Sequence, residues 1–214
     1  MTQALAAYNE NGLILATDSR ATRFSPEGQA EYFSVKKLYP LGKFAAILSG
    51  GAGVSVPLSL ALRHEIEQRR GLTEVDEMAE FALPFLSRAY ARHLEQHGPG
   101  AEDLRRIYFI LAGYSPNLPH PGFRLFLLGS EEHELPLKSA PVGNLIVMPR
   151  NLGMEMRLFK ALAANAPLAD LLKMSREFLE KMAQTKEEVG PPFYYATITP
   201  AGYEEVGVGL GGGG

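Results

Sequence analysis

The stretch Met1–Thr22 constrains the fold more than any other, because it has the pattern of a β-hairpin that ends in charge. Thr2–Tyr8 and Leu13–Thr17 are apolar runs that predict two strands, and the Asn-Gly pair between them is typical of a tight turn. The second run is apolar almost throughout, which predicts burial on both faces. Asp18 follows it directly, and a carboxylate there is costly unless it is paired or used. The hairpin therefore predicts a buried acid beside the start of the chain.

Thr2 carries two groups that can react together once Met1 is removed. A small second residue normally lets an aminopeptidase remove the initiator methionine, which leaves a hydroxyl and a free amine on one residue. The hydroxyl is then a nucleophile and the amine is its base. An α-amine has a pKa of roughly 7.7–8.0, so part of it is neutral near pH 7. Lys37, in a strand-like run after a polar loop, is the candidate cation that would lower that pKa further.

Three motifs resemble those of the proteasome β-subunit family, which includes the bacterial HslV-type peptidases and their Anbu-type relatives. They are GLILATDSRAT at Gly12–Thr22, KKLYPL at Lys36–Leu41 and SGGAG at Ser49–Gly53. The resemblance is specific over the first quarter of the chain and becomes one of element order beyond it. It implies a four-layer αββα sandwich of the N-terminal nucleophile hydrolase type, within the α+β class.

The resemblance also implies roles for individual residues. Thr2 falls on the nucleophile, Asp18 on a buried aspartate, Lys37 on the catalytic lysine and Gly51 on the glycine whose N–H binds the oxyanion. The side chain before the cleaved bond would enter a roomy, largely apolar pocket lined by Ala21, Val35, Ser49 and Gly53. The implied activity is that of a self-compartmentalising threonine peptidase without a cofactor. Its implied partners are its own copies in a ring or spiral, an ATPase unfoldase, and a peptide or protein substrate.

Each of these residues taken alone also fits a structural role. Asp-Ser-Arg after a strand fits a turn with a salt bridge, and the Lys-Lys pair fits a solvated strand edge. The glycines of Ser49–Gly53 can present N–H groups to an anion at a helix start, or can simply allow close packing at a strand-to-helix turn. The four together, at family-like spacing, favour the active-site interpretation.

Two late stretches depart from the family pattern. Active members carry a supporting aspartate and serine before the penultimate strands, where Lys186 and Val189 stand in this chain. The other supporting serine is missing from Met148–Gly153. Groups that lack such support often lose activity. Two further functions therefore stay open: a small-amide hydrolase on the same fold, and a catalytically silent subunit that assembles or binds partners.

The composition bounds the remaining function classes. The chain has 214 residues, no cysteine and a formal net charge of −3, which gives no electrostatic basis for binding nucleic acid. No apolar run is long enough to cross a membrane, and the N-terminus lacks the basic region of a signal peptide. The absence of cysteine excludes disulfides and thiolate metal sites. We expect a cytoplasmic protein with no membrane or nucleic-acid partner.

Helical patterns occur in two pairs, Val54–Arg70 with Thr73–His97 and Leu152–Ala164 with Pro167–Gln184. Pro84 predicts a kink or a break in the second of these. Strand patterns fill the rest at Phe33–Leu41, Phe44–Ser49, Arg106–Tyr114, Phe123–Leu128, Leu137–Met148, Phe193–Thr199 and Tyr203–Val208. This order predicts two sheets packed face to face with helices outside each. It also predicts one domain over residues 1–208 and a flexible glycine-rich tail over residues 209–214.

Two groups of residues have ligand chemistry but favour structural roles. Glu131–Glu134 contains three acids and a histidine, and we interpret it as a surface acidic turn. His93 and His97 share a helix face, and we interpret them as exposed residues near a helix end. The sequence therefore predicts no metal site.

Overall fold

The computed structural model describes residues 2–25, 27–69, 71–98 and 106–209. Within these ranges the chain forms four α-helices and twelve β-strands, and the strands make three antiparallel sheets. This combination of helices and antiparallel strands confirms the predicted α+β class. Met1 and residues 210–214 lie outside the described ranges, so the predicted tail falls there except for Gly209, which ends the last strand.

The first sheet contains the predicted N-terminal hairpin. Ala4 lies opposite Thr17, and Asn9 lies opposite Gly12 at the turn. The order of its strands is β10 (Leu145–Met148), β1 (Ala4–Asn9), β2 (Gly12–Thr17), β11 (Phe193–Thr199) and β12 (Gly202–Gly209). Every residue of β2 is buried, as its unbroken apolar run predicts. The hairpin is thus held at the centre of its sheet, with β10 and β11 on either side.

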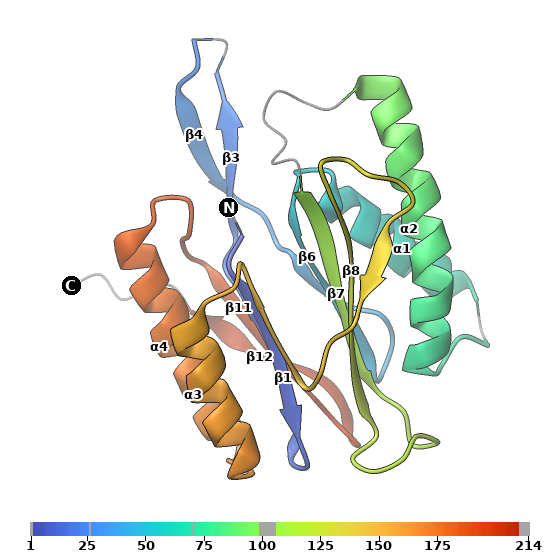
Figure 1. Cartoon of the computed structure of the whole chain (residues 1–214), viewed down its shortest axis with the longest axis vertical. Helices are drawn as coiled ribbons and strands as arrows, with labels where there is room; N and C mark the ends of the chain where they lie inside the picture. The colour runs from blue at the N-terminus through green and yellow to red at the C-terminus, as the bar shows by residue number, and fades with distance from the viewer. Residues whose placement is uncertain (1, 26, 70, 99–105, 210–214) are drawn as a thin grey trace.

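The second sheet holds the strand that leads into the glycine motif. The order of its strands is β5 (Leu38–Pro40), β6 (Ala45–Gly51), β7 (Arg106–Tyr114), β8 (Phe123–Glu131) and β9 (Lys138–Ala140). A separate two-stranded hairpin, β3 (Arg20–Phe24) and β4 (Ala30–Ser34), projects from the body of the molecule in Figure 1. Its base connects directly to the residues that follow Asp18 and precede Lys37.

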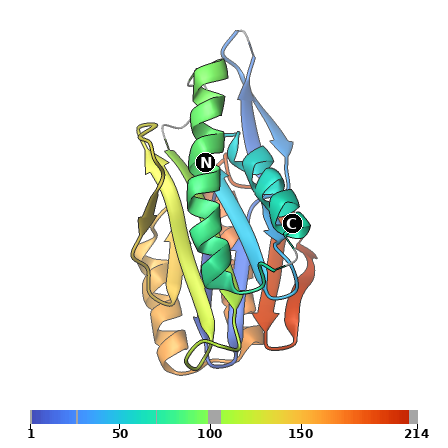
Figure 2. The same ribbon diagram turned by 90° about the vertical axis from the view of Figure 1, so that its right-hand side faces the viewer.

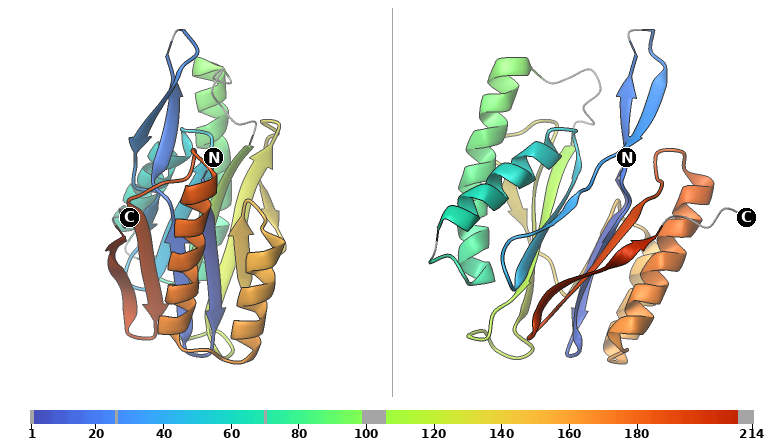
Figure 3. Two further views of the ribbon diagram at one scale, coloured as in Figure 1. Left: turned by 90° about the vertical axis from the view of Figure 1, so that its left-hand side faces the viewer. Right: turned by 180° about the vertical axis from the view of Figure 1, so that it is seen from behind.

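Two pairs of helices cover the outer faces of the two sheets, as Figures 1, 2 and 3 show. Side chains of α1 (Ser55–Gln68) and α2 (Val75–His97) share a core with the second sheet, around Ile47, Leu86 and Phe109. Side chains of α3 (Leu152–Ala163) and α4 (Leu168–Thr185) share a core with the first sheet. A third core lies between the sheets and includes Leu15, Leu48 and Ile110.

The structure corrects three details of the predicted elements. The predicted strand Phe33–Leu41 is interrupted between Ser34 and Leu38, where the backbone turns to direct Lys37 inwards. Strand β3 lies outside the predicted strands, because its sequence is short, largely polar and lacks an apolar alternation. Of the two outcomes predicted at Pro84, a kink or a break, the break does not occur: α2 continues through Pro84, since residues on both sides of the proline are buried in the same core.

The remaining sequence predictions concern sites outside the fold itself. Glu131–Glu134 forms a turn in which the Glu134 N–H donates to the Glu131 carbonyl at 3.0 Å. In the part of the chain that the structure describes, no group of three or more His, Cys, Asp or Glu side chains is placed to hold a metal ion. No described helix is both long enough and apolar enough to span a membrane.

Candidate active site

The N-terminal hairpin brings Asp18 to the start of the chain. The Gln3 N–H donates to Asp18 Oδ1 at 2.9 Å, and the Asp18 N–H donates to the Gln3 carbonyl at 3.1 Å. The Arg20 N–H donates to the other carboxylate oxygen, Oδ2, at 3.0 Å. Thr2 is buried and directly precedes Gln3, which makes two of these hydrogen bonds. The carboxylate therefore fixes the backbone next to Thr2.

Lys37 completes the polar cluster from the base of the β3–β4 hairpin, just after β4. Its Nζ lies 3.3 and 3.4 Å from the two carboxylate oxygens of Asp18 and donates to the Arg20 carbonyl at 2.7 Å. The Lys37 side chain is 4% exposed and that of Asp18 is fully buried. Lys36 points elsewhere and pairs with Glu205 at the surface. Only the second lysine of the pair thus turns inwards.

Burial controls the electrostatics of the Asp18–Lys37 pair. It raises the pKa of the Asp18 carboxyl, and the Lys37 charge and the Gln3 N–H oppose that rise. It lowers the pKa of the Lys37 ammonium, and the Asp18 charge opposes that change. Each group thus offsets part of the desolvation cost of the other, and the carboxylate also accepts from two backbone N–H groups.

The second sheet contacts Thr2 at two residues that sequence reasoning missed. The Tyr108 hydroxyl, on β7, donates to the Thr2 carbonyl at 3.2 Å. Burial raises the pKa of Tyr108, so it stays protonated and keeps this donor. On β6, a Cβ added to Gly50 would lie 2.9 Å from Thr2 Cβ and would also collide with the Tyr108 ring. Gly50 therefore leaves the space in which Thr2 sits.

Gly51, the predicted oxyanion glycine, follows Gly50 at the end of β6. Its φ of +85° favours glycine, and an added Cβ would collide with the Arg106 carbonyl. The Ala52 N–H donates to that same carbonyl at 2.8 Å, shortly before α1 begins at Ser55. The glycines are therefore required both by the close approach of β7 and by the position of Thr2.

The four residues predicted to line the substrate pocket are less closely gathered. Ala21 on β3 and Val35 beyond β4 are half-buried. Gly53 is exposed and lines a groove of about 410 Å³ between α1 and the end of α2. Ser49 is fully buried and, by strand alternation with Ile47, faces the helices, and its Oγ has no hydrogen-bond partner among the described residues.

The late loop before β11 reaches the site through backbone groups. The Ser19 N–H donates to the Gly190 carbonyl at 3.2 Å, and the Arg20 guanidinium donates to the Glu187 carbonyl at 2.5 Å. Val189 is buried against α3 and α4, on the far side of the first sheet. The loop therefore supports the segment that follows Asp18.

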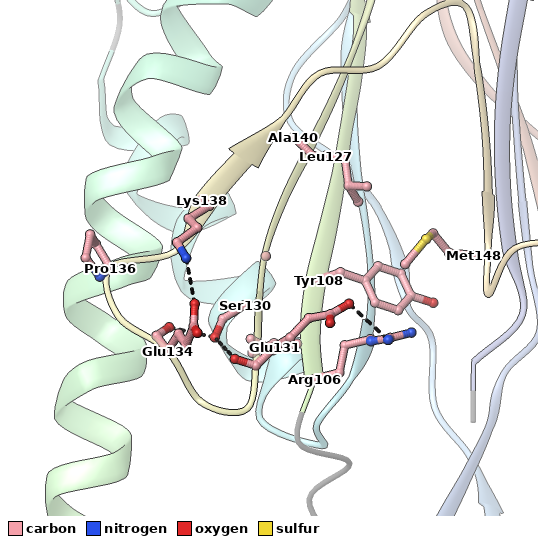
Figure 4. Close-up of a pocket in the computed structure, with 12 residues that line it drawn as sticks. Arg106, Tyr108, Leu127, Ser130, Glu131, Glu134, Pro136, Lys138, Ala140 and Met148 are labelled. Atoms are coloured by element: carbon pink, nitrogen blue, oxygen red, sulfur yellow. Dashed lines mark hydrogen bonds and ion pairs between the residues drawn. The ribbon is translucent and has the colours of Figure 1, made fainter.

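A pocket of about 360 Å³ adjoins the site next to Tyr108 and Met148 (Figure 4). Tyr108, Met148 and Arg106 lie at one end of it, and Lys138, Glu134 and Pro136 lie at the other. The Met148 carbonyl also accepts from Gln3 Nε2 at 3.2 Å. The pocket thus shares Tyr108 and Met148 with the surroundings of the N-terminal strand.

Comparison with known proteins gave no match, either to a protein-family model or to a curated protein. A hydroxyl shortly before the first strand, a buried cation paired with an acid, and a glycine motif that approaches Thr2 at Gly50 suit nucleophilic attack on a carbonyl.

Proposed function

We propose that the protein is an N-terminal threonine hydrolase that cleaves peptide bonds. The observation that carries this proposal is the buried Asp18–Lys37 pair, which holds the backbone beside Thr2 while Gly50 leaves room for that residue. A buried ion pair is costly to maintain, and such pairs cluster at functional sites. On the same grounds we propose that the four layers form an αββα sandwich of the N-terminal nucleophile hydrolase type, within the proteasome β-subunit family.

The proposed reaction begins after Met1 is removed. Thr2 Oγ forms a bond to the carbonyl carbon of the substrate, and its proton passes to the Thr2 α-amine. The carbonyl π electrons move to the oxygen, where the Gly51 N–H stabilises the negative charge. The C–N bond then breaks, and the proton on the α-amine passes to the leaving amine. Water hydrolyses the resulting ester, which releases the acid and returns the proton to Thr2 Oγ.

Lys37 acts in this scheme as a fixed positive charge. Asp18 and the Arg20 carbonyl hold its ammonium, so it favours the alkoxide of Thr2 without leaving its place. Ala21 and Val35, which are half-buried, would receive the side chain before the cleaved bond, whereas Ser49 faces the helices and Gly53 lines the groove between α1 and α2.

We also propose that the protein works in the cytoplasm as an assembly of its own copies, in a ring or spiral, on peptide or protein substrates that an ATPase unfoldase can supply. Large apolar side chains support the assembly. Leu152, Met156 and Phe159 lie one helical turn apart on α3 and are 70%, 49% and 61% exposed. Exposed apolar groups that line up in this way are typical of protein contacts.

The experiment that tests the proposed function compares Thr2→Ala with Thr22→Ala, a threonine on the neighbouring β3 strand. Intact mass should show loss of Met1 from the unaltered protein, and a threonine-directed electrophile should add to it once. Thr2→Ala should lose the labelling and at least about a thousandfold of peptide cleavage, because the nucleophile is gone, whereas Thr22→Ala should keep both. Cleavage that survives in Thr2→Ala would refute the scheme.

A silent assembly subunit is the second candidate, and the late loop favours it. Val189 packs into the core, and the hydrogen bonds between this loop and the described part of the site run to Ser19, Arg20, Tyr32 and Ser34, not to Thr2. This candidate predicts a retained Met1 and no labelling. A third, a small-amide hydrolase, predicts labelling together with turnover of small amides and none of unfolded proteins.

A further inference from the structure

The pocket of Figure 4 lies towards one edge of the second sheet, whereas Val35, one of the residues expected to bind the acyl part of the substrate, lies shortly before β5 at the other edge. Thr2 contacts Gly50 on β6 and Tyr108 on β7, which are neighbours near the middle of the second sheet. Val35 lies shortly before β5, at one edge of that sheet. The pocket is lined from β7, β8 and β9, at the other edge of that sheet, together with Met148. A peptide that crosses Thr2 from one edge to the other would therefore place its leaving part over the pocket.

The lining of the pocket is apolar in its interior. Leu127 and Ala140, which lie opposite each other on β8 and β9, contribute aliphatic groups, and the Tyr108 ring and Met148 close the end next to Thr2. Ligand sites of this kind measure roughly 300–1,000 Å³ and are lined mainly by apolar groups. A volume of about 360 Å³ stands at the small end of that range and is ample for one bulky side chain.

Among the described residues that line the pocket, two cations and two acids form pairs at its rim. An Arg106 guanidinium nitrogen lies 2.9 Å from a Glu131 carboxylate oxygen, and Lys138 Nζ lies 2.6 Å from a Glu134 carboxylate oxygen. Both cations that line the pocket thus already have a carboxylate partner. A free terminal carboxylate on the leaving part would therefore gain little, whereas an uncharged continuing chain would lose nothing.

We infer that this pocket binds the residue that follows the cleaved bond, that it selects a bulky apolar side chain there, and that the bond is internal to a peptide. The inference rests on the proposed function and adds a substrate class to it. It also favours a peptidase over a hydrolase of small acidic amides, because the leaving part is recognised by apolar contact and not by charge.

The test uses internally quenched peptides that are identical up to the cleaved bond and carry Leu, Phe, Gly or Asp after it. Unaltered protein should cleave the Leu and Phe peptides at least about tenfold more efficiently than the Gly peptide, measured as kcat/KM. Ala140→Trp should reduce this preference to less than about threefold, because the indole fills the pocket from the exposed edge strand β9.

Ser139→Trp is the matched control. Ser139 is also exposed on β9, but strand alternation directs it to the opposite face from Ala140. The preference of Ser139→Trp for the Leu and Phe peptides should therefore stay unchanged. A second comparison uses two Leu peptides. One continues beyond Leu and ends in an amide, and the other ends at Leu with a free carboxylate. The amidated peptide should be cleaved at least as well.

Labelling of Thr2 by a peptide epoxyketone, which has no leaving group, tests the proposed threonine hydrolase separately from the pocket inference. Labelling with equal cleavage of all four peptides, or equal preference in Ala140→Trp and unaltered protein, would overturn the pocket inference alone. A strong preference for the free carboxylate would overturn the internal-bond part. Absence of labelling in the unaltered protein would overturn both the proposed function and the inference.

Discussion

Two buried side chains, Asp18 and Lys37, carry a desolvation cost at the site. Their charges are buried, and each offsets the desolvation of the other. Removing one partner leaves an uncompensated charge, which is far more damaging than removing a surface pair. This asymmetry makes the pair testable by stability as well as by activity.

Lys37→Met should lower the free energy of unfolding by about 3–5 kcal/mol at pH 7, because it leaves the Asp18 carboxylate buried and unpaired. Lys36→Met, its neighbour in a surface pair with Glu205, should cost less than about 1 kcal/mol. Urea denaturation measures both. Equal losses in the two variants would contradict the role assigned to the buried pair.

The same variant should show a defined pH dependence. Burial already raises the pKa of Asp18 above its ordinary 3.8, and loss of Lys37 raises it further. A group whose pKa is raised on folding contributes stability that is present below its unfolded pKa and is lost as pH rises through its folded pKa. The deficit of Lys37→Met relative to the unaltered protein should therefore shrink as pH falls from 7 towards 4.

At the scale of elements, the features that depend on short stretches of sequence could be predicted, and the contacts between distant residues could not. The N-terminal hairpin and the inward turn of Lys37 follow from short stretches of sequence, and the structure has both. Gly50 and Tyr108 are far apart in the chain, and only the pairing of β6 with β7 brings them together beside Thr2. No local pattern in the sequence contains that register.

Helix α2 shows tertiary packing overriding a local signal. Pro84 cannot donate to the Glu80 carbonyl, yet the buried residues Ala82 and Leu86 on either side of the proline keep the helix on the second sheet. Pro84 removes a helix hydrogen bond, but the burial of this face of the helix outweighs that loss.

Pro84→Ala should therefore stabilise the protein by about 1–3 kcal/mol, because it restores a helix hydrogen bond. Pro57→Ala is the control, since Pro57 lies in the first turn of α1, where no N–H is needed. Thermal unfolding measures both variants. The explanation fails if Pro84→Ala is no more stable than Pro57→Ala.

At the scale of the whole molecule, the site belongs to both sheets. Thr2 and Asp18 come from the first sheet, whereas Gly50 and Tyr108 come from the second. Their alignment therefore depends on the core between the sheets, and not on the cores beneath the helices.

Two adjacent residues of β7 test this dependence. Ile110 is buried between the sheets, and Leu111 is buried against α1 and α2. Either one replaced by Ala should cost about 2–5 kcal/mol of stability. Only Ile110→Ala should also slow the labelling of Thr2, by about tenfold or more, when both variants are fully folded. Equal labelling rates in the two variants would show that the sheets do not need this core for alignment.

The edge strand β9 has a spectroscopic consequence. The chain contains no tryptophan, so it has no indole emission of its own. A single indole at Ala140 would be the sole such fluorophore and would stand at the mouth of the pocket beside Thr2. Its emission would report directly whether the indole is buried in the pocket or exposed to water, and the indole at Ser139 would supply the solvent-exposed reference signal.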